Sequence, residues 1–261
     1  MSKKVPITRF PDAAAVTYSQ AIRKMILELG NEILKQFEMH VEPSLIESRQ
    51  DSTEFVVDGI FDNIKRMLTA IKNKADKVFS ERRTQSAAQR FVNSVNRFNK
   101  HNIEKQLVVK GIDPTQREPW LDSFLNNKIK DNVGYIKSIE VDYLSEIENV
   151  VRNGVKDGRT AKQIREQLVE RVKVAESRAQ FIAVDQTGSI LGQMTAERHQ
   201  QIGIDKFKWL TSHDERVRDS HKALNKEVFS YDDPPTANGR VVLPGEDYRC
   251  RCVAIPVFEN L

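Results

Sequence analysis

The sequence predicts an α+β fold, with an extended, mostly α-helical N-terminal region followed by a small α+β C-terminal domain that holds a short, mostly antiparallel sheet. Two observations predict it. Apolar residues recur at three- and four-residue steps through most of the chain up to Gly203, which is the period of amphipathic helices. From Ile204 onward, short apolar runs alternate with turn-rich stretches, as in small sheets. We divide the chain into a helical region, 1–150, and a C-terminal domain, 151–261.

The helical region begins after an extended arm. The first thirteen residues contain Pro6 and Pro11 and lack periodicity. A capping box, Asp51 with Glu54, precedes the second helix, and Thr160 with Gln163 forms a similar start later. The predicted helices cover, in chain order, roughly 13–41, 51–71, 78–109, 120–133, 136–151, 160–172 and 177–203.

The strands are predicted after Ile204. Phe207 and Trp209 alternate with lysines, as on a half-buried strand. Three further strand-like runs follow at 228–231, 240–243 and 252–257. The stretches between them, 232–235 and 237–239, are rich in Asp, Pro, Asn and Gly and are predicted as turns.

Composition limits the class of protein. The chain has 261 residues, a net charge of +4 and 30% charged residues. No stretch approaches the roughly 18 apolar residues that span a bilayer, so we expect no membrane partner. Its two cysteines are one residue apart, which excludes a disulfide scaffold and favours a reducing, intracellular site of assembly.

Positive charge is concentrated in one helical segment. Only Glu81 and Glu104 oppose its six basic residues, which are Arg82, Arg83, Arg90, Arg97, Lys100 and Lys105. Such a segment is typical of a solvated helix face. The alternative is a face that contacts the phosphates of nucleic acid.

The two cysteines, Cys250 and Cys252, follow His213 and His221 in the C-terminal domain. Thiolates and imidazoles are zinc ligands, and a His–Cys pair also occurs in nucleophilic catalysis. However, the sequence has no nucleophile elbow, oxyanion signature or phosphate-binding glycine loop. We therefore expect no enzymatic activity.

The C-terminal domain carries two motifs in order. They are Trp209-x-Thr211-Ser212-x-Asp214-x-Arg216-Val217-Arg218-x-x-His221-x-Ala223-Leu224 and Pro244-Gly245-x-Asp247-x-x-Cys250-Arg251-Cys252. Together they resemble the phage Mu F-like minor head proteins, also called head-morphogenesis proteins, over about 151–258. The resemblance implies a minor virion protein inside the head near the portal, assembled in the host cytoplasm.

The resemblance also implies partners. The portal protein comes first, with scaffold or major capsid protein as further partners, and double-stranded DNA as a molecule that the protein contacts or whose delivery it modulates. We expect partner contact chiefly through the helical region, because its apolar faces exceed what one small domain needs to cover.

Many members of that family have a Cys-x-x-Cys pair in the first motif and a His-x-x-Cys pair in the second, which is a zinc spacing. Here those positions hold Arg218, His221, Asp247 and Cys250. Arg218 cannot ligate a metal because its guanidinium stays protonated. We therefore expect no cofactor and predict a structural clamp, in which Arg218 and Asp247 form a bidentate ion pair beside His221 and Cys250. The alternative is zinc held by His221, Cys250 and Cys252, with His213 or Asp247 as the fourth ligand.

Two other functions stay open. A nucleic-acid-binding module would use the basic helix Arg82–Lys105. A phage-borne effector enzyme would need an additional domain after Leu261.

Overall fold

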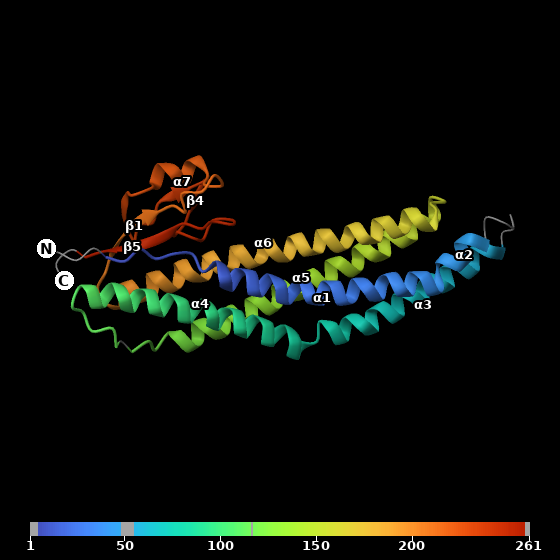
Figure 1. Ribbon diagram of the computed structural model, residues 1–261, viewed down its shortest axis with the longest axis horizontal. Coiled ribbons are helices and arrows are strands. Elements are labelled where there is room, and N and C mark those ends of the chain that lie inside the picture. Colours follow the sequence, from blue (N-terminus) through green and yellow to red (C-terminus); the bar gives the residue numbers. More distant parts are fainter. Residues whose placement is uncertain (1–4, 48–54, 116, 259–261) are drawn as a thin grey trace. The chain divides into compact units, whose positions relative to one another are not determined.

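The computed structural model describes residues 5–47, 55–115 and 117–258 (Figure 1). The capping box predicted at Asp51 and Glu54 lies outside these residues. The described helices are α1 (Asp12–His40), α2 (Glu42–Glu47), α3 (Phe55–Val78), α4 (Glu81–Val109), α5 (Leu121–Lys156), α6 (Ala161–Gln201) and α7 (Asp219–Leu224). The described strands are β1 (Lys206–Leu210), β2 (Val228–Ser230), β3 (Thr236–Ala237), β4 (Arg240–Val241) and β5 (Val253–Val257). The fold class is α+β, as predicted.

Two pairs of predicted helices are single helices. The segments 120–133 and 136–151 belong to α5, and the segments 160–172 and 177–203 belong to α6. Gly134 lies inside α5 and Ser177 inside α6. An internal glycine costs a helix only about 1 kcal/mol, so Gly134 does not end α5. The start predicted at Thr160 is confirmed: Gln163 donates its backbone N–H to Thr160 Oγ1, and Gln163 Oε1 accepts from the Thr160 N–H.

The chain forms two compact units, each built from separate segments of sequence. The first comprises Met1–Tyr18, Ala88–Asp131 and Phe181–Leu261, and the second comprises Ser19–Ala87 and Asn132–Gln180. The boundary predicted near residue 150 falls inside α5, and each unit contains residues from both sides of it. Whether 1–150 and 151–261 have separate functions stays a prediction.

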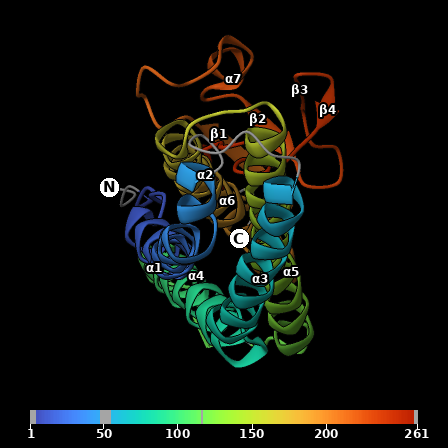
Figure 2. The same cartoon turned by 90° about the vertical axis from the view of Figure 1, so that its right-hand side faces the viewer.

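The second unit is helical, with parts of α1, α3, α5 and α6 packed around a common core (Figure 2). Its buried side chains recur at helical spacing and include Ile22, Ile26, Leu29, Ile33, Ile64, Met67, Ile71, Ile139, Ile147 and Leu168. The helices bury these faces against one another, while other apolar side chains of the helical region, among them Leu27 and Val141, stay exposed. That partner contact runs chiefly through the helical region stays a prediction.

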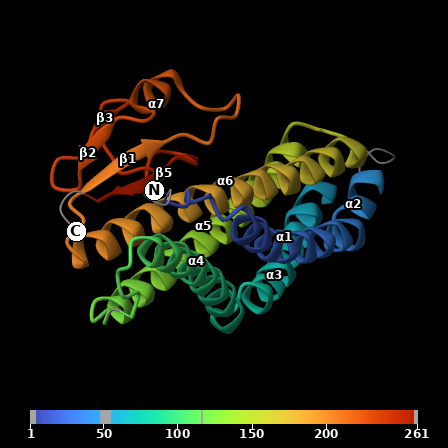
Figure 3. The same ribbon diagram turned by 60° about the vertical axis from the view of Figure 1, so that its left-hand side comes forward.

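The first unit contains the sheet, which lies along the C-terminal part of α6 (Figure 3). The strand order is β2-β1-β5, and both pairs are antiparallel. Phe207 and Trp209 point to one face of β1 and are fully buried, as the alternation predicts. They pack with Ala196 of α6 and with both cysteines in one hydrophobic cluster. A second, two-stranded ribbon pairs β3 with β4, where the sequence predicted turns and one longer strand.

A buried polar network also belongs to the first unit. The Arg198 side chain is 4% exposed, and its Nε lies 2.5 Å from Glu118 Oε1. Its other nitrogens donate to Asn96 and Asn99, and Asn99 donates to Thr195. The paired carboxylate offsets the cost of burying a guanidinium, so this network ties α4 and the segment before α5 to α6.

His199 is buried in the same unit. Its Nδ1 lies 2.6 Å from the hydroxyl of Tyr231. Burial disfavours the imidazolium and lowers the pKa of His199 to about 3. Between this value and the ordinary value of 6.5, the unfolded chain binds a proton that the folded chain does not. The folded state therefore loses stability as the pH falls below 6.5.

We predict that His199→Gln removes part of this acid sensitivity. A fully neutral buried histidine implies a loss of about 1.4 kcal/mol in the free energy of unfolding between pH 7.5 and 5.5. Urea unfolding at the two pH values measures it, with exposed His101→Gln on α4 as the control. An equal loss in wild type and His199→Gln would contradict the prediction.

Candidate metal centre

The centre rests on a close contact between helix α6 and the loop before β5. Gly188 and Gly192, one turn apart in α6, face the backbone of this loop. A Cβ at Gly188 would lie 2.5 Å from the carbonyl oxygen of Gly245 and 2.6 Å from that of Cys250. A Cβ at Gly192 would lie 2.4 Å from the Pro244 carbonyl oxygen. Only glycine allows this approach, so these two positions fix where the Cys-x-Cys segment lies.

The loop turns at Gly245, which has φ +100. The backbone N–H of Arg249 donates to Asp185 on α6 at 3.1 Å, which holds the far end of the loop on the same helix. Gly188 and Gly192 were not predicted from the sequence, where their only signal is a pair of glycines four residues apart on a helix.

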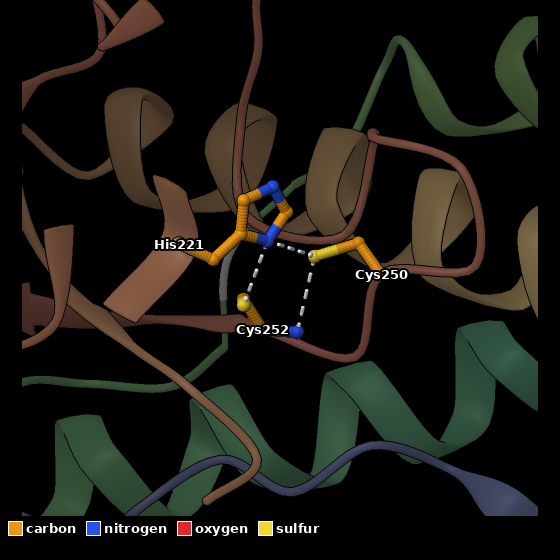
Figure 4. A group of neighbouring side chains, drawn as sticks. All are labelled: His221, Cys250 and Cys252. Atoms are coloured by element: carbon orange, nitrogen blue, oxygen red, sulfur yellow. Dashed lines mark hydrogen bonds between the residues drawn. The ribbon is translucent and has the colours of Figure 1, made fainter. Parts of the chain in front are cut away.

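Three buried side chains lie close together in this part of the domain. They are His221 from α7, and Cys250 and Cys252 from the segment that precedes β5 (Figure 4). The Nδ1 atom of His221 lies 3.5 Å from the sulfur of Cys250 and 3.5 Å from that of Cys252. The three side chains are 2%, 4% and 2% exposed. Among the residues that the structure describes, these three form the one group of three or more His, Cys, Asp or Glu residues that could hold a metal ion, and their ligand atoms lie within 4.8 Å of one another.

Asp247 contacts the Nε2 atom of His221 and is not one of the three potential metal ligands. Its Oδ2 accepts hydrogen bonds from His221 Nε2 at 3.0 Å, Arg218 Nη1 at 3.0 Å and Asn238 Nδ2 at 2.6 Å. Its Oδ1 accepts the backbone N–H of Tyr248 at 2.9 Å. The carboxylate therefore joins α7, the β3–β4 turn and the Cys-x-Cys segment.

The structure brings together the four residues of the predicted clamp, but with different geometry. The ion pair between Arg218 and Asp247 uses one guanidinium nitrogen, and Nη2 of Arg218 donates to the carbonyl of Tyr248 at 2.6 Å. The predicted bidentate pair is thus wrong, because His221 and Asn238 share the same carboxylate oxygen. The sequence predicts Asn238 only as a turn residue, which agrees with its φ of +52 beside Gly239 but gives no sign of its bond to Asp247.

His213 does not join the centre. Its Nδ1 faces the hydroxyl of Thr211 at 3.4 Å, and its backbone has φ +57. It is therefore not placed as the fourth ligand that one alternative required.

The local charges shift the titration of all four groups. Burial alone would raise the pKa of Asp247, but Asn238, the Tyr248 N–H and the charge of Arg218 together lower it. The hydrogen bond to Cys250 raises the pKa of His221 despite burial. The side chain of Cys252, together with His221, lowers the pKa of Cys250 to about 5, while the same contact and burial raise the pKa of Cys252. Cys250 is the more acidic thiol of the pair.

A cavity of about 230 Å³ opens over the centre. All three buried side chains border it, together with Ser212, Asp214 and four arginines, Arg216, Arg218, Arg249 and Arg251. Asp214 pairs with Arg216 at 3.2 Å and lies 3.9 Å from Arg251. The three side chains are buried, but the cavity connects them to solvent, and arginines line its rim.

The basic residues predicted as nucleic-acid contacts all lie on α4. Arg82, Arg90, Arg97, Lys100 and Lys105 are exposed. Arg83 is half-buried and pairs with Glu28 at 2.9 Å. At 100° per residue the six positions fall within an arc of about 140°, and Glu104 lies in the same arc. The first two belong to the second compact unit, and the other four belong to the first.

The fold and the centre define a class: a small α+β domain in which a histidine and a Cys-x-Cys pair converge on one buried point, seated on a long helix. Residues 145–255 match the family described as "Phage Mu protein F like protein". Over this segment the chain is similar to the phage Mu F-like family, as the resemblance predicted.

Two curated relatives match part of the chain. An "Uncharacterized protein" of Haemophilus influenzae is 35% identical over 159 residues, which are 61% of this chain and 35% of the relative. The "NAD(+)--arginine ADP-ribosyltransferase EFV" of Enterococcus faecalis is 25% identical over 126 residues, which are 44% of this chain and 26% of the relative. The chain thus spans about a third or less of these relatives. No solved structure gives a significant match.

We predict that Gly188→Ala destabilises the protein by about 1–3 kcal/mol, the usual cost of overpacking, because the new Cβ would collide with two backbone oxygens. Gly134→Ala on α5 is the matched control, since a Cβ there meets nothing within 4 Å. It should stabilise by about 0.5–1 kcal/mol through helix propensity. Urea unfolding of both variants measures the difference. Equal stability of the two variants would show that the loop does not rest on α6 as described.

Proposed function

We propose that the protein is a minor structural component of a tailed-phage head that associates with the portal protein during procapsid assembly. The observation that carries this proposal is the match of residues 145–255 to the phage Mu F-like family. That family points to phage head morphogenesis and to association with the virion. The position in the head interior near the portal, and the presence in the host cytoplasm during assembly, are part of the proposal.

The helical second unit supports an assembly role. None of the described helices is long and apolar enough to cross a bilayer. Because the helix core is internally packed, docking has to use side chains that remain outside. Several are apolar, among them Leu27, Val141 and Val174, which are 44%, 63% and 49% exposed. Scaffold and major capsid protein are the other head components that this surface would meet.

We assign the buried centre a structural role and no catalytic one. Four donors occupy the carboxylate of Asp247, so it has no role left as a general base toward a substrate. The contacts of the centre are internal and link segments of one domain. Catalysis by the Cys250–His221 pair would make turnover depend on the Cys250 thiol.

The proposal predicts a stable complex between the full-length chain and the portal protein of the same phage. The full chain is needed because residues 1–150 include Ala88–Asp131 of the first unit, so deleting them would remove part of the domain under test. Co-purification at increasing salt, followed by native mass spectrometry, measures the complex. An apolar contact should persist as salt rises. Failure of the two proteins to associate under any condition would overturn the proposal.

The docking surface is tested with two sets of matched substitutions. Leu27→Arg, Val141→Arg and Val174→Arg together alter the helical surface, and they should reduce portal binding by at least tenfold. Val228→Arg with Val241→Arg alters equally exposed valines of the C-terminal domain, 45% and 67% exposed, and should leave binding unchanged. The opposite result would move the portal contact to the C-terminal domain.

A second candidate function is contact with double-stranded DNA through α4, which the one-sided placement of its basic residues favours. Binding through phosphates weakens steeply with salt, with a slope of about 0.9 per contact. Arg97→Gln, Lys100→Gln and Lys105→Gln together should lower this slope by up to about 3. Exposed Lys24→Gln, Lys35→Gln and Lys72→Gln form the control, and fluorescence anisotropy with duplex DNA is the measurement. Equal slopes for the two triple variants would remove α4 as the DNA-contacting face.

A further inference from the structure

The four zinc positions implied by the family do not fit this chain. Arg218 stays protonated, and its two terminal nitrogens donate hydrogen bonds to Asp247 and to the Tyr248 carbonyl. Asp247 faces Nε2 of His221, on the side of the ring away from the sulfurs. Only His221 and Cys250 of that set are placed as ligands.

A different set does fit. We propose that this chain binds zinc through a shifted ligand set, made of His221 Nδ1 and the sulfurs of Cys250 and Cys252, with Asp247 moved from ligand to positioning residue. This inference stands on the centre alone and does not depend on the proposed head function.

The distances match a tetrahedral zinc site. Zinc lies about 2.3 Å from thiolate sulfur and about 2.0–2.1 Å from imidazole nitrogen, which places the two ligand atoms about 3.5 Å apart at the tetrahedral angle. Both nitrogen–sulfur distances in the centre are 3.5 Å. Two of the three distances between ligand atoms therefore already match those of such a tetrahedron, and all three atoms lie within 4.8 Å of one another (Figure 4).

The ring nitrogen that faces the sulfurs is not used by the carboxylate. Asp247 accepts a hydrogen bond from Nε2, and Nδ1 faces both sulfurs at 3.5 Å. In the neutral ring with its proton on Nε2, Nδ1 offers the lone pair that a metal ligand needs. A metal ion at this point would bind all three ligand atoms at once.

The residues around the three ligands hold and balance them. A carboxylate on the far nitrogen of a ligating histidine fixes its tautomer and ring orientation. Arg218 and Asn238 hold that carboxylate in turn. The backbone N–H of Cys252 points to Cys250 Sγ at 3.3 Å, which stabilises a thiolate. Two thiolates would neutralise a dication, and Arg218 neutralises Asp247.

The fourth position is left to solvent. The cavity of about 230 Å³ borders all three ligands, and the side chains that line it otherwise include no further cysteine or histidine. Three protein ligands and a water molecule in the fourth position complete a tetrahedral zinc site, whereas a closed structural site has four protein ligands.

Metal content of the full-length protein, purified without chelator, is the first test. Native mass spectrometry should find one zinc per chain. Exchange for Co²⁺ should produce thiolate-to-cobalt charge-transfer absorption in the near ultraviolet and the visible bands of tetrahedral cobalt. Protein that carries no zinc and takes up no Co²⁺ would overturn the proposal and leave the metal-free clamp.

Three substitutions separate the shifted set from the family set. Cys252→Ser should abolish stoichiometric zinc and weaken the charge-transfer band. Asp247→Asn should lower zinc affinity about 10–100-fold but retain the wild-type cobalt spectrum, as expected of a residue that acts through His221. Arg218→Gln should also retain that spectrum. Full zinc occupancy in Cys252→Ser would overturn the shifted set. A changed cobalt spectrum in Asp247→Asn would assign Asp247 as a ligand and overturn it as well. Circular dichroism checks that each variant folds. If Cys252→Ser does not fold, the cobalt spectrum of the wild type still tests whether thiolates bind the metal.

Discussion

The C-terminal domain depends on one buried carboxylate. Asp247 accepts hydrogen bonds from the side chains of His221, Arg218 and Asn238 and from its neighbouring backbone N–H. These donors come from α7 and the residue before it, from the β3–β4 turn and from the Cys-x-Cys segment. An unpaired buried carboxylate would be costly, so the donors and the acceptor have to be placed together. Asp247 therefore links α7, the β3–β4 turn and the Cys-x-Cys segment in one buried hydrogen-bond network.

The glycines of α6 form the surface against which the loop that carries Asp247 packs. Gly188 and Gly192 let the backbone at Pro244, Gly245 and Cys250 touch the helix directly. The helix thus carries two kinds of contact in the same unit: backbone against backbone at the glycines, and Ala196 against the aromatic side chains of β1. A small domain with a three-stranded sheet has little apolar area to bury, and such close approach adds packing that side chains alone would not provide.

The sequence was sufficient for the features that depend on local pattern. The alternation around Trp209 predicts β1, and the Thr160–Gln163 pair predicts the start of α6. It was insufficient where a contact joins distant segments: Asn238 gives no sign that its side chain reaches Asp247, nor Gly188 that a loop lies against it. The motif spacing brought Arg218, His221, Asp247 and Cys250 to attention, but spacing does not say which ring nitrogen each group faces.

That distinction decides the chemistry of the centre. A histidine has two ring nitrogens, and in His221 they contact different groups: Nε2 contacts a carboxylate, and Nδ1 faces two sulfurs. A carboxylate on the sulfur side would make Asp247 a ligand, whereas on the opposite side it orients the ring. Arg218 then has a reason to stand beside it, because it neutralises a charge that no metal contacts. The Arg–Asp pair and the three sulfur and nitrogen donors are thus two adjoining layers of one centre, and substitution at the outer layer leaves the inner ligand set intact.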